Sequence, residues 1–189
     1  MAVKYFAYGS NLDLLQMKGR CPSSELISKG SLPGYRLTFN RYSTGWGGGV
    51  ADVIKDQGSE VWGLVFELSD TDLKRLDGYE GCYKDQTSLY ERWKAVIDTP
   101  DGQVCNVWVY TVVEKQKFVQ PTAEYLQIIR DAAARWNFPQ TFQRALELPQ
   151  PGDWCDTVPA SLAKMDQTDI DEKYSRSTLN SVPEEDEKW

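Results

Sequence analysis

The order of strand-like and helix-like segments constrains the fold of this chain more than any other feature of its sequence. Six segments have the apolar and β-branched composition that is typical of strands. They cover residues 3–8, 32–43, 50–54, 60–68, 89–97 and 103–113. The helix-like segments between them are few and do not alternate regularly with the strands. This order excludes a series of βαβ units and predicts an α+β fold, with a mainly antiparallel sheet or small barrel and helices packed at its ends.

Helix start signals recur at four places along the chain. A short helix follows Ser10 or Asn11, either of which can cap it. A second helix begins at Ser69, which has the spacing of a capping box, and ends near Gly78. The longest helix opens at Pro121 with apolar residues at helical spacing, and a short one comes after it. Glu80 is therefore expected in a loop, just beyond the second helix.

Acidic residues are concentrated at the C-terminal end. The chain carries 21 Lys and Arg against 28 Asp and Glu, a net charge of −7, and residues 166–189 contribute eight acids against three bases, or −5. The rest of the chain is nearly neutral, so a nucleic acid is not an expected partner. We predict one domain over residues 1–150, followed by an acidic, poorly structured extension over residues 151–189.

The absence of histidine limits the chemistry that this chain can perform. It excludes nucleophilic triads with an imidazole base and zinc sites with histidine ligands. In an enzyme of this composition, Glu, Asp, Tyr, Lys or Cys must move the protons. The four cysteines are scattered, and the apolar run at the N-terminus is too short for a signal peptide. We therefore expect a cytoplasmic protein with free thiols and no membrane partner.

Three glycine-containing segments could bind a ligand. Residues 8–12 lie between a strand and a helix, where backbone N–H groups converge on an anion. Residues 46–52 are dense in glycine, which permits close approach to a ligand or another strand. Glu80 lies between two glycines and could act as an acid and base in a cleft. On residue types alone, an ordinary helix cap, an ordinary turn and an exposed glutamate are the more frequent interpretations.

Taken in order, these and neighbouring motifs resemble the gamma-glutamylcyclotransferase family, with its AIG2-like fold. The resemblance covers roughly residues 3–148. The matching motifs are Tyr-Phe-Ala-Tyr-Gly-Ser-Asn-Leu at 5–12, Arg-Cys-Pro at 20–22, Leu-Pro-Gly-Tyr-Arg-Leu at 32–37, Gly-Gly-Val-Ala-Asp at 48–52, Glu-Val-Trp-Gly at 60–63, Leu-Asp-x-x-Glu-Gly at 76–81 and Pro-x-x-x-Tyr at 121–125. The family's fold implies a small mixed, mainly antiparallel β-barrel flanked by helices.

The resemblance also implies an activity and a set of site residues. In gamma-glutamyl cyclotransfer the substrate's α-amine attacks its own γ-carbonyl, which releases 5-oxoproline and an amino acid or amine, as in glutathione metabolism. The catalytic acid and base is then Glu80, and this lyase-type reaction needs no metal or cofactor. The implied substrate-binding residues are Tyr8, Gly9, Ser10, Asn11, Leu12, Tyr90 and Tyr125. The spacing after Glu80 leaves Tyr83 as an alternative to Tyr90.

Two further interpretations stay open beside a general enzyme. The first is a pathway-specific enzyme that removes a γ-glutamyl group from a natural-product or glutathione-derived intermediate. The second is a non-catalytic binding module on the same fold, although the glutamate at position 80 argues against it. In each case the expected partner is a small γ-glutamyl molecule. The leaving group, the oligomeric state and the role of the acidic tail are left open by the sequence.

Overall fold

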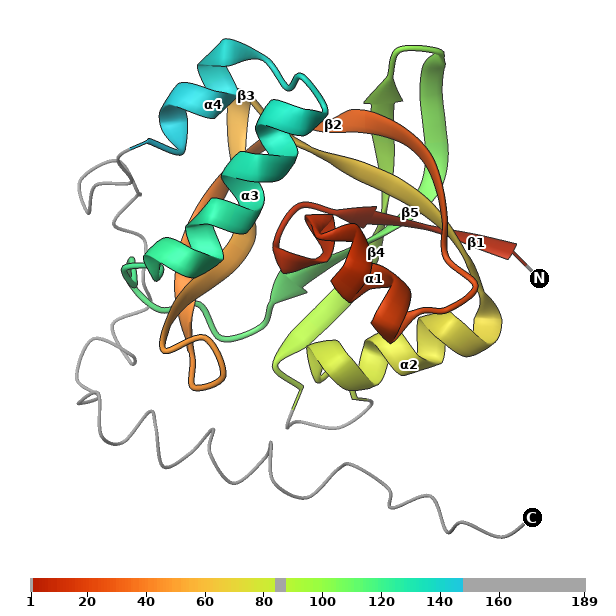
Figure 1. Ribbon diagram of the computed structural model, residues 1–189, viewed down its shortest axis with the longest axis horizontal. Helices are drawn as coiled ribbons and strands as arrows, with labels where there is room; N and C mark the ends of the chain where they lie inside the picture. The colour runs from red at the N-terminus through yellow and green to blue at the C-terminus, as the bar shows by residue number, and fades with distance from the viewer. Residues whose placement is uncertain (1, 84–87, 148–189) are drawn as a thin grey trace, which may run out of the picture.

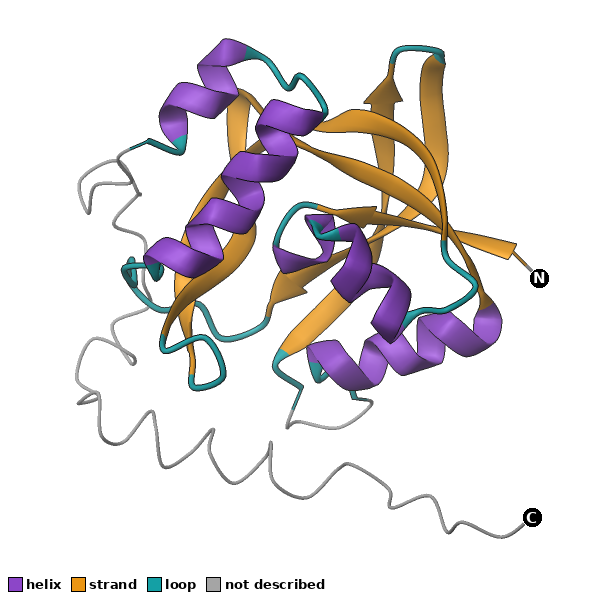
Figure 2. Cartoon of the chain, in the orientation of Figure 1, coloured by secondary structure: helices purple, strands orange, loops and turns teal. Residues whose placement is uncertain are grey.

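The computed structural model describes residues 2–83 and 88–147, and these residues form a closed five-stranded barrel flanked by helices (Figures 1 and 2). The strand order around the barrel is β1-β3-β2-β4-β5. The strands are β1 (Ala2–Ala7), β2 (Glu25–Ser43), β3 (Gly48–Ser69), β4 (Tyr90–Thr99) and β5 (Gly102–Val112). This architecture confirms the predicted α+β fold. The predicted extension at 151–189 lies outside the described residues.

The closure of the barrel makes its sheet mixed. Strand β1 pairs antiparallel with β3 and parallel with β5, and the other strand pairs are antiparallel. The β4–β5 hairpin turns at Pro100-Asp101-Gly102, as predicted. Apolar side chains of the strands fill the core. Fully buried examples are Phe6, Phe39, Leu32, Leu64, Leu68, Ile97, Val61, Val65 and Val107.

The hairpin of β2 and β3 is longer than the sequence indicated. Its register runs from Glu25 opposite Glu67 to Ser43 opposite Gly48. The predicted strands at 50–54 and 60–68 are thus parts of one strand, β3, with a register shift between the pairs Pro33–Glu60 and Tyr35–Lys55. Register shifts such as the one between Phe39 and Arg41 interrupt the ladder. Such irregularities bend a strand and allow a small sheet to close.

Short helices pack beside the barrel ends of β1 and β3. Residues Ser10–Leu12 form a 3₁₀ turn, η1, and α1 (Leu14–Arg20) follows it. The cap of α1 is Asp13, whose carboxylate accepts from the N–H of Leu15, so the predicted cap at Ser10 or Asn11 is wrong. The side-chain oxygen of Ser69 does cap the next helix, α2 (Asp70–Glu80), as its spacing predicted.

The longest helix, α3 (Ala123–Arg135), lies along the β2–β3 hairpin, and α4 (Gln140–Ala145) follows it (Figure 1). Four of the residues that the periodicity indicated are buried: Tyr125, Ile129, Ala132 and Ala133. Leu126, which it did not indicate, is buried as well, whereas Ile128 and Trp136, which it did, are half-buried. Within residues 2–83 and 88–147, no helix has the length and apolar character needed to cross a membrane.

Candidate active site

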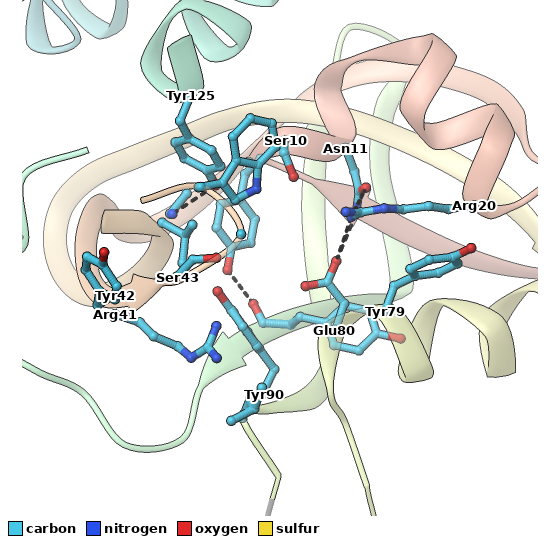
Figure 3. Close-up of a pocket in the computed structure, with 18 of the residues that line it drawn as sticks. Ser10, Asn11, Arg20, Arg41, Tyr42, Ser43, Tyr79, Glu80, Tyr90 and Tyr125 are labelled. Atoms are coloured by element: carbon cyan, nitrogen blue, oxygen red, sulfur yellow. Dashed lines mark hydrogen bonds and ion pairs between the residues drawn. The ribbon is translucent and has the colours of Figure 1, made fainter. Parts of the chain in front are cut away.

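A cavity of about 400 Å³ opens where η1, the β2–β3 turn and the end of α2 meet (Figure 3). Seven of the eight predicted site residues line it, and Leu12 does not. Those seven are Tyr8, Gly9, Ser10, Asn11, Glu80, Tyr90 and Tyr125. The side chain of Leu12 is buried in the core, and its N–H donates to the Gly9 carbonyl oxygen at 3.0 Å. Segments far apart in the sequence thus converge on one site.

The end of helix α2 directs Glu80 into this cavity. Contrary to the sequence prediction, the helix does not stop near Gly78, and Glu80 is its last residue. The helix ends at Gly81, which adopts a left-handed conformation with φ of 63° that favours glycine. The Cys82 N–H then donates to the Asp77 carbonyl at 2.8 Å. Because Glu80 is helical, its direction is fixed more firmly than a loop would allow.

Two residues one turn before Glu80 attach the helix to the barrel. Residues three and four apart lie on one helix face, so Leu76 and Asp77 share a side with Glu80. The Leu76 side chain is fully buried. The Asp77 carboxylate accepts from the Tyr110 hydroxyl at 2.7 Å and pairs with Arg92 at 3.1 Å. Each defined position of the Leu-Asp-x-x-Glu-Gly motif therefore has its own role. Leu76 packs in the core and Asp77 bonds to β4 and β5. Glu80 places its carboxylate in the cavity, and Gly81 ends the helix.

The carboxylate of Glu80 is held by two polar neighbours. Its Oε1 accepts from Asn11 Nδ2 at 3.0 Å and lies 3.8 Å from a guanidinium nitrogen of Arg20. The same guanidinium donates to Asn11 Oδ1 at 2.8 Å, which fixes the orientation of the amide (Figure 3). Burial raises the pKa of Glu80, while Arg20, Asn11 and Arg41 act in the opposite direction. A carboxyl group with a raised pKa is suited to both accepting and returning a proton.

The raised pKa of Glu80 predicts a pH-dependent effect on stability. The folded-state pKa lies above the unfolded value of about 4.3, so the group's stabilising contribution is present below that value. The contribution is lost as pH rises through the folded-state pKa, where the buried carboxyl ionises. Glu80→Gln removes this titration. We expect its free energy of unfolding, relative to wild type, to improve as pH rises from the unfolded pKa of about 4.3 through the raised folded-state pKa. Urea unfolding of both proteins across this pH range measures the effect. A difference in free energy of unfolding that stays constant with pH would contradict the prediction.

The hydroxyl of Tyr125 joins the first loop to strand β3. Its oxygen accepts a hydrogen bond from the Ala51 N–H at 3.0 Å and another from the backbone N–H of Ser10. A Cβ at Gly9 would lie 3.0 Å from this oxygen, so glycine permits the close approach. The first bond within η1 is made by Leu12, which leaves the N–H groups of residues 10 and 11 unused by the turn. The helix face alone predicted burial of Tyr125, and the structure adds this polar contact.

Tyr125→Phe tests whether this hydroxyl holds the loop. The substitution keeps the ring but removes the acceptor of the buried Ala51 N–H. Leaving such a group unsatisfied costs about 1–3 kcal/mol. We expect this loss in the free energy of unfolding, together with lower turnover, measured by urea denaturation and kinetics. Tyr42→Phe is the control, because that ring lines the same cavity but is only half-buried. If both variants were as stable as wild type, the Tyr125 hydroxyl would not be needed to hold the loop.

Of the two tyrosines considered after Glu80, only Tyr90 is among the described residues that line the cavity. Tyr90 begins β4 and is buried, whereas Tyr83 is 38% exposed. The hydroxyl of Tyr8 donates to the Tyr110 carbonyl at 2.6 Å, which fixes its ring in the cavity wall.

Sequence reasoning gave no role to several lining residues. Arg20 lies in the Arg-Cys-Pro motif that carried part of the resemblance, so a signal for it existed. No pattern identified Arg41, since the sequence could not say which strand faces would border the cavity. Trp46 begins the glycine-rich segment at 46–52, which the sequence did offer as a possible ligand-binding segment. Tyr5 was expected only as part of a strand, and its hydroxyl accepts from Asn11 Nδ2 at 2.9 Å.

Known proteins are similar to this chain in sequence and in fold. The family model described as "Gamma-glutamyl cyclotransferase, AIG2-like" matches residues 5–137. The chain is 29% identical over 154 residues to the gamma-glutamylcyclotransferase of Bos taurus, covering 79% of this chain and 80% of that one. It is 29% identical over 160 residues to the Homo sapiens enzyme, covering 82% of each. A solved structure titled "Gamma-glutamyl cyclotransferase" superposes with a TM-score of 0.72 at 26% identity, covering 86% of this chain and 96% of the other.

Proposed function

Because the chain belongs to the gamma-glutamyl cyclotransferase, AIG2-like family, we propose that it is a gamma-glutamylcyclotransferase. The observation that carries this proposal is the position of Glu80, at the end of α2, facing a cavity that the loop at 8–11 also lines. The bovine and human relatives, whose alignments cover about four-fifths of this chain, are named gamma-glutamylcyclotransferase. The substrate is thus a small molecule with a γ-glutamyl group.

The proposed reaction follows from the position of one carboxylate. Glu80 takes a proton from the substrate's α-amine, which then attacks the γ-carbonyl carbon of the same molecule. A C–N bond forms, a five-membered ring closes, and negative charge develops on the carbonyl oxygen. Glu80 then returns the proton to the departing nitrogen as the original amide C–N bond breaks. The products are 5-oxoproline and a free amine, and no water, oxidant or reductant is consumed.

The loop at 8–11 is proposed to hold the γ-glutamyl half. Neither the N–H of Ser10, which contacts the Tyr125 hydroxyl, nor that of Asn11 is used by the η1 turn, and both residues line the cavity. Backbone N–H groups arranged in advance can stabilise a developing oxyanion without further reorganisation. Tyr8, Tyr90 and Tyr125 form buried walls around this half of the cavity. Gly9 leaves room for the Tyr125 hydroxyl, and Leu12 supports the loop from the core.

A 5-oxoproline release assay tests the proposal. The panel contains γ-glutamyl dipeptides, glutathione and γ-glutamyl-amines, each incubated with the purified full chain. Release from small dipeptides is the expected result for a general enzyme of glutathione metabolism. Release from bulky γ-glutamyl-amines alone would instead indicate a pathway-specific enzyme. Binding of these compounds without release would contradict the proposal and support a binding module.

A cytoplasmic setting fits the cysteines that the structure describes. Cys21, Cys82 and Cys105 are free thiols, and burial raises the pKa of Cys21 to about 12 and also raises that of Cys82. A thiol whose pKa is raised is a poor nucleophile, and free cysteines are typical of reducing compartments. We therefore assign proton transfer to Glu80 and not to Cys21 or Cys82.

A further inference from the structure

The side chain of Asn11 has no part in the proposed reaction, although the residue belongs to the loop that lines the cavity. Asn11 is 3% exposed and lies in the 3₁₀ turn η1, between β1 and α1. In Figure 3, Asn11 and Arg20 lie on the same side of the cavity as Glu80. The loop's proposed contact with substrate uses backbone N–H groups, so it does not require this side-chain amide.

Four hydrogen bonds use the whole capacity of the Asn11 amide. Its Nδ2 donates to the Tyr5 hydroxyl at 2.9 Å and to Glu80 Oε1 at 3.0 Å. Its Oδ1 accepts from Gln16 Nε2 at 3.2 Å and from Arg20 at 2.8 Å. An asparagine amide has two N–H donors and two acceptor positions. The side chain therefore has no hydrogen-bonding group left for a substrate.

Arg20 determines which way round this amide lies. A guanidinium has only donors, so the side-chain oxygen of Asn11 must face Arg20. The NH₂ group then faces Glu80, whose ionised carboxylate has only acceptors. An aspartate at position 11 could not make both contacts, because its two side-chain oxygens both accept.

The contact with Asn11 directs one oxygen of Glu80. The end of α2 fixes the backbone of this residue, but its side chain can still adopt several rotamers. Among the residues that the structure describes, the hydrogen bond from Asn11 and the ion pair with Arg20 both involve Oε1. With Oε1 held in this way, Oε2 is the oxygen that can approach the α-amine of a substrate.

We propose that Asn11 is a positioning residue, whose side chain binds Glu80 instead of the substrate and turns the catalytic carboxylate toward the reacting amine. This inference rests on the proposed function and adds a residue that acts through Glu80. A donor to an ionised carboxylate also stabilises the form that accepts a proton. In agreement with this, the hydrogen bond from Asn11 lowers the pKa of Glu80, against the effect of burial.

The other titratable groups around Glu80 come from every neighbouring element. Arg20 on α1 and Arg41 on β2 act on it as cations, and arginine stays charged at any working pH. Burial raises the pKa of the tyrosines that border Glu80, namely Tyr5, Tyr8, Tyr90, Tyr110 and Tyr125. Burial also raises the pKa of the thiols of Cys21 and Cys82. Among the described residues that line the cavity, Glu80 is the one carboxyl group, so the acidic limb of the kcat profile reports its ionisation.

Asn11→Asp tests the inference through this limb. The variant keeps the size of the side chain and an oxygen facing Arg20, but it replaces the donor to Glu80 by an acceptor. Two carboxylate oxygens about 3 Å apart cannot easily ionise together, so the pKa of the pair rises. With γ-glutamyl-alanine as substrate, we expect the acidic limb of kcat to move upward by about one pH unit or more, with KM close to wild type. A raised KM with the limb unmoved would overturn the inference, because it would mean that the amide binds substrate.

Asn40→Asp is the matched control. Asn40 is also a buried asparagine whose Nδ2 donates to a carboxylate, that of Asp52 at 2.8 Å, but it does not line the cavity. Both variants should lose stability, and the limb should move only in Asn11→Asp. Movement in both variants, or in neither, would overturn the inference. Should an aspartate variant fail to fold, Asn11→Ser and Asn40→Ser make the same comparison, with a smaller upward movement expected for Asn11→Ser.

A titration without substrate separates this inference from the proposed function. Carbon-13 NMR of the glutamate carboxyl groups, with the Glu80 signal assigned by its loss in Glu80→Gln, follows the ionisation directly. The Glu80 signal should titrate at higher pH in Asn11→Asp than in wild type, and identical titration would overturn the inference. If wild type released no 5-oxoproline while this signal still moved, the proposed function would be contradicted and the contact between Asn11 and Glu80 supported.

Discussion

Glu80→Gln is expected to lower kcat by at least about 10²-fold, and by up to about 10⁴-fold or more, while the protein stays folded. Glutamine keeps the size of glutamate and can still contact Asn11, but it cannot accept and return a proton. One carboxylate serves both the attacking amine and the departing nitrogen in the proposed reaction, so both transfers fail together. The KM should change little, because the loop at 8–11 lies on other elements and is intact. The measurement is 5-oxoproline release at saturating substrate, with circular dichroism to verify folding.

Glu67→Gln is the matched control for this variant. Glu67 lies on β3, the strand that leads into α2, and it does not line the cavity. The same chemical change there should leave kcat close to the wild-type value, because Glu67 lies outside the cavity in which the proton is transferred. A folded Glu80→Gln protein that keeps more than about a tenth of wild-type kcat would contradict the role of Glu80, since general acid–base catalysis contributes more than this.

Asp52→Ala is expected to cause the largest loss of stability, about 3–5 kcal/mol in the free energy of unfolding. Asp52 is fully buried on β3, yet it carries a carboxylate. That carboxylate accepts from Asn40 at 2.8 Å and from the Val112 N–H at 3.0 Å, and it pairs with Lys115 at 2.8 Å. Alanine would leave the buried N–H of Val112 and the partly buried ammonium of Lys115 without the Asp52 carboxylate. Because these contacts join β2, β3 and the end of β5, the loss should affect the whole barrel.

Urea denaturation of Asp52→Ala beside Asp56→Ala measures this effect. Asp56 lies on the same strand, but its side chain is 40% exposed and its ion pair with Arg36 spans 3.6 Å. A pair of this kind contributes about 0–1 kcal/mol. Adding Lys115→Met to Asp52→Ala should recover part of the loss by removing the unpaired charge. Equal small losses in the two alanine variants would show that the buried cluster contributes no more than a surface pair.

The elements predicted best were those whose signals are local. The Ser69 cap, the hairpin turn at 100–102 and the apolar face of α3 each depend on residues within one or two turns, and all three were found. The errors fell where pairing between distant segments decided the outcome. The polar residues between 54 and 60 look like a break in the sequence, but pairing of β2 with the residues on both sides, Lys55 and Glu60, makes them an irregularity within one strand. The end of α2 was placed too early because Gly78 resembles a stop, whereas the left-handed turn falls at Gly81.

Residue types alone exclude imidazole chemistry, since the chain has no histidine, and the motifs predicted the family, the α+β barrel and the acidic residue proposed as the catalyst. Those properties depend on residue types and on motifs that can be read in order. The cavity was decided by the tertiary structure, because closure of the barrel brings β2, the first loop, α2 and α3 to one place. Only this closure sets Arg20 beside Glu80 and brings Arg41 to the cavity from a separate strand. Alternation of apolar and polar residues along a strand predicts which face of the sheet a side chain lies on. Which part of the molecule packs against that face depends on segments distant in the sequence.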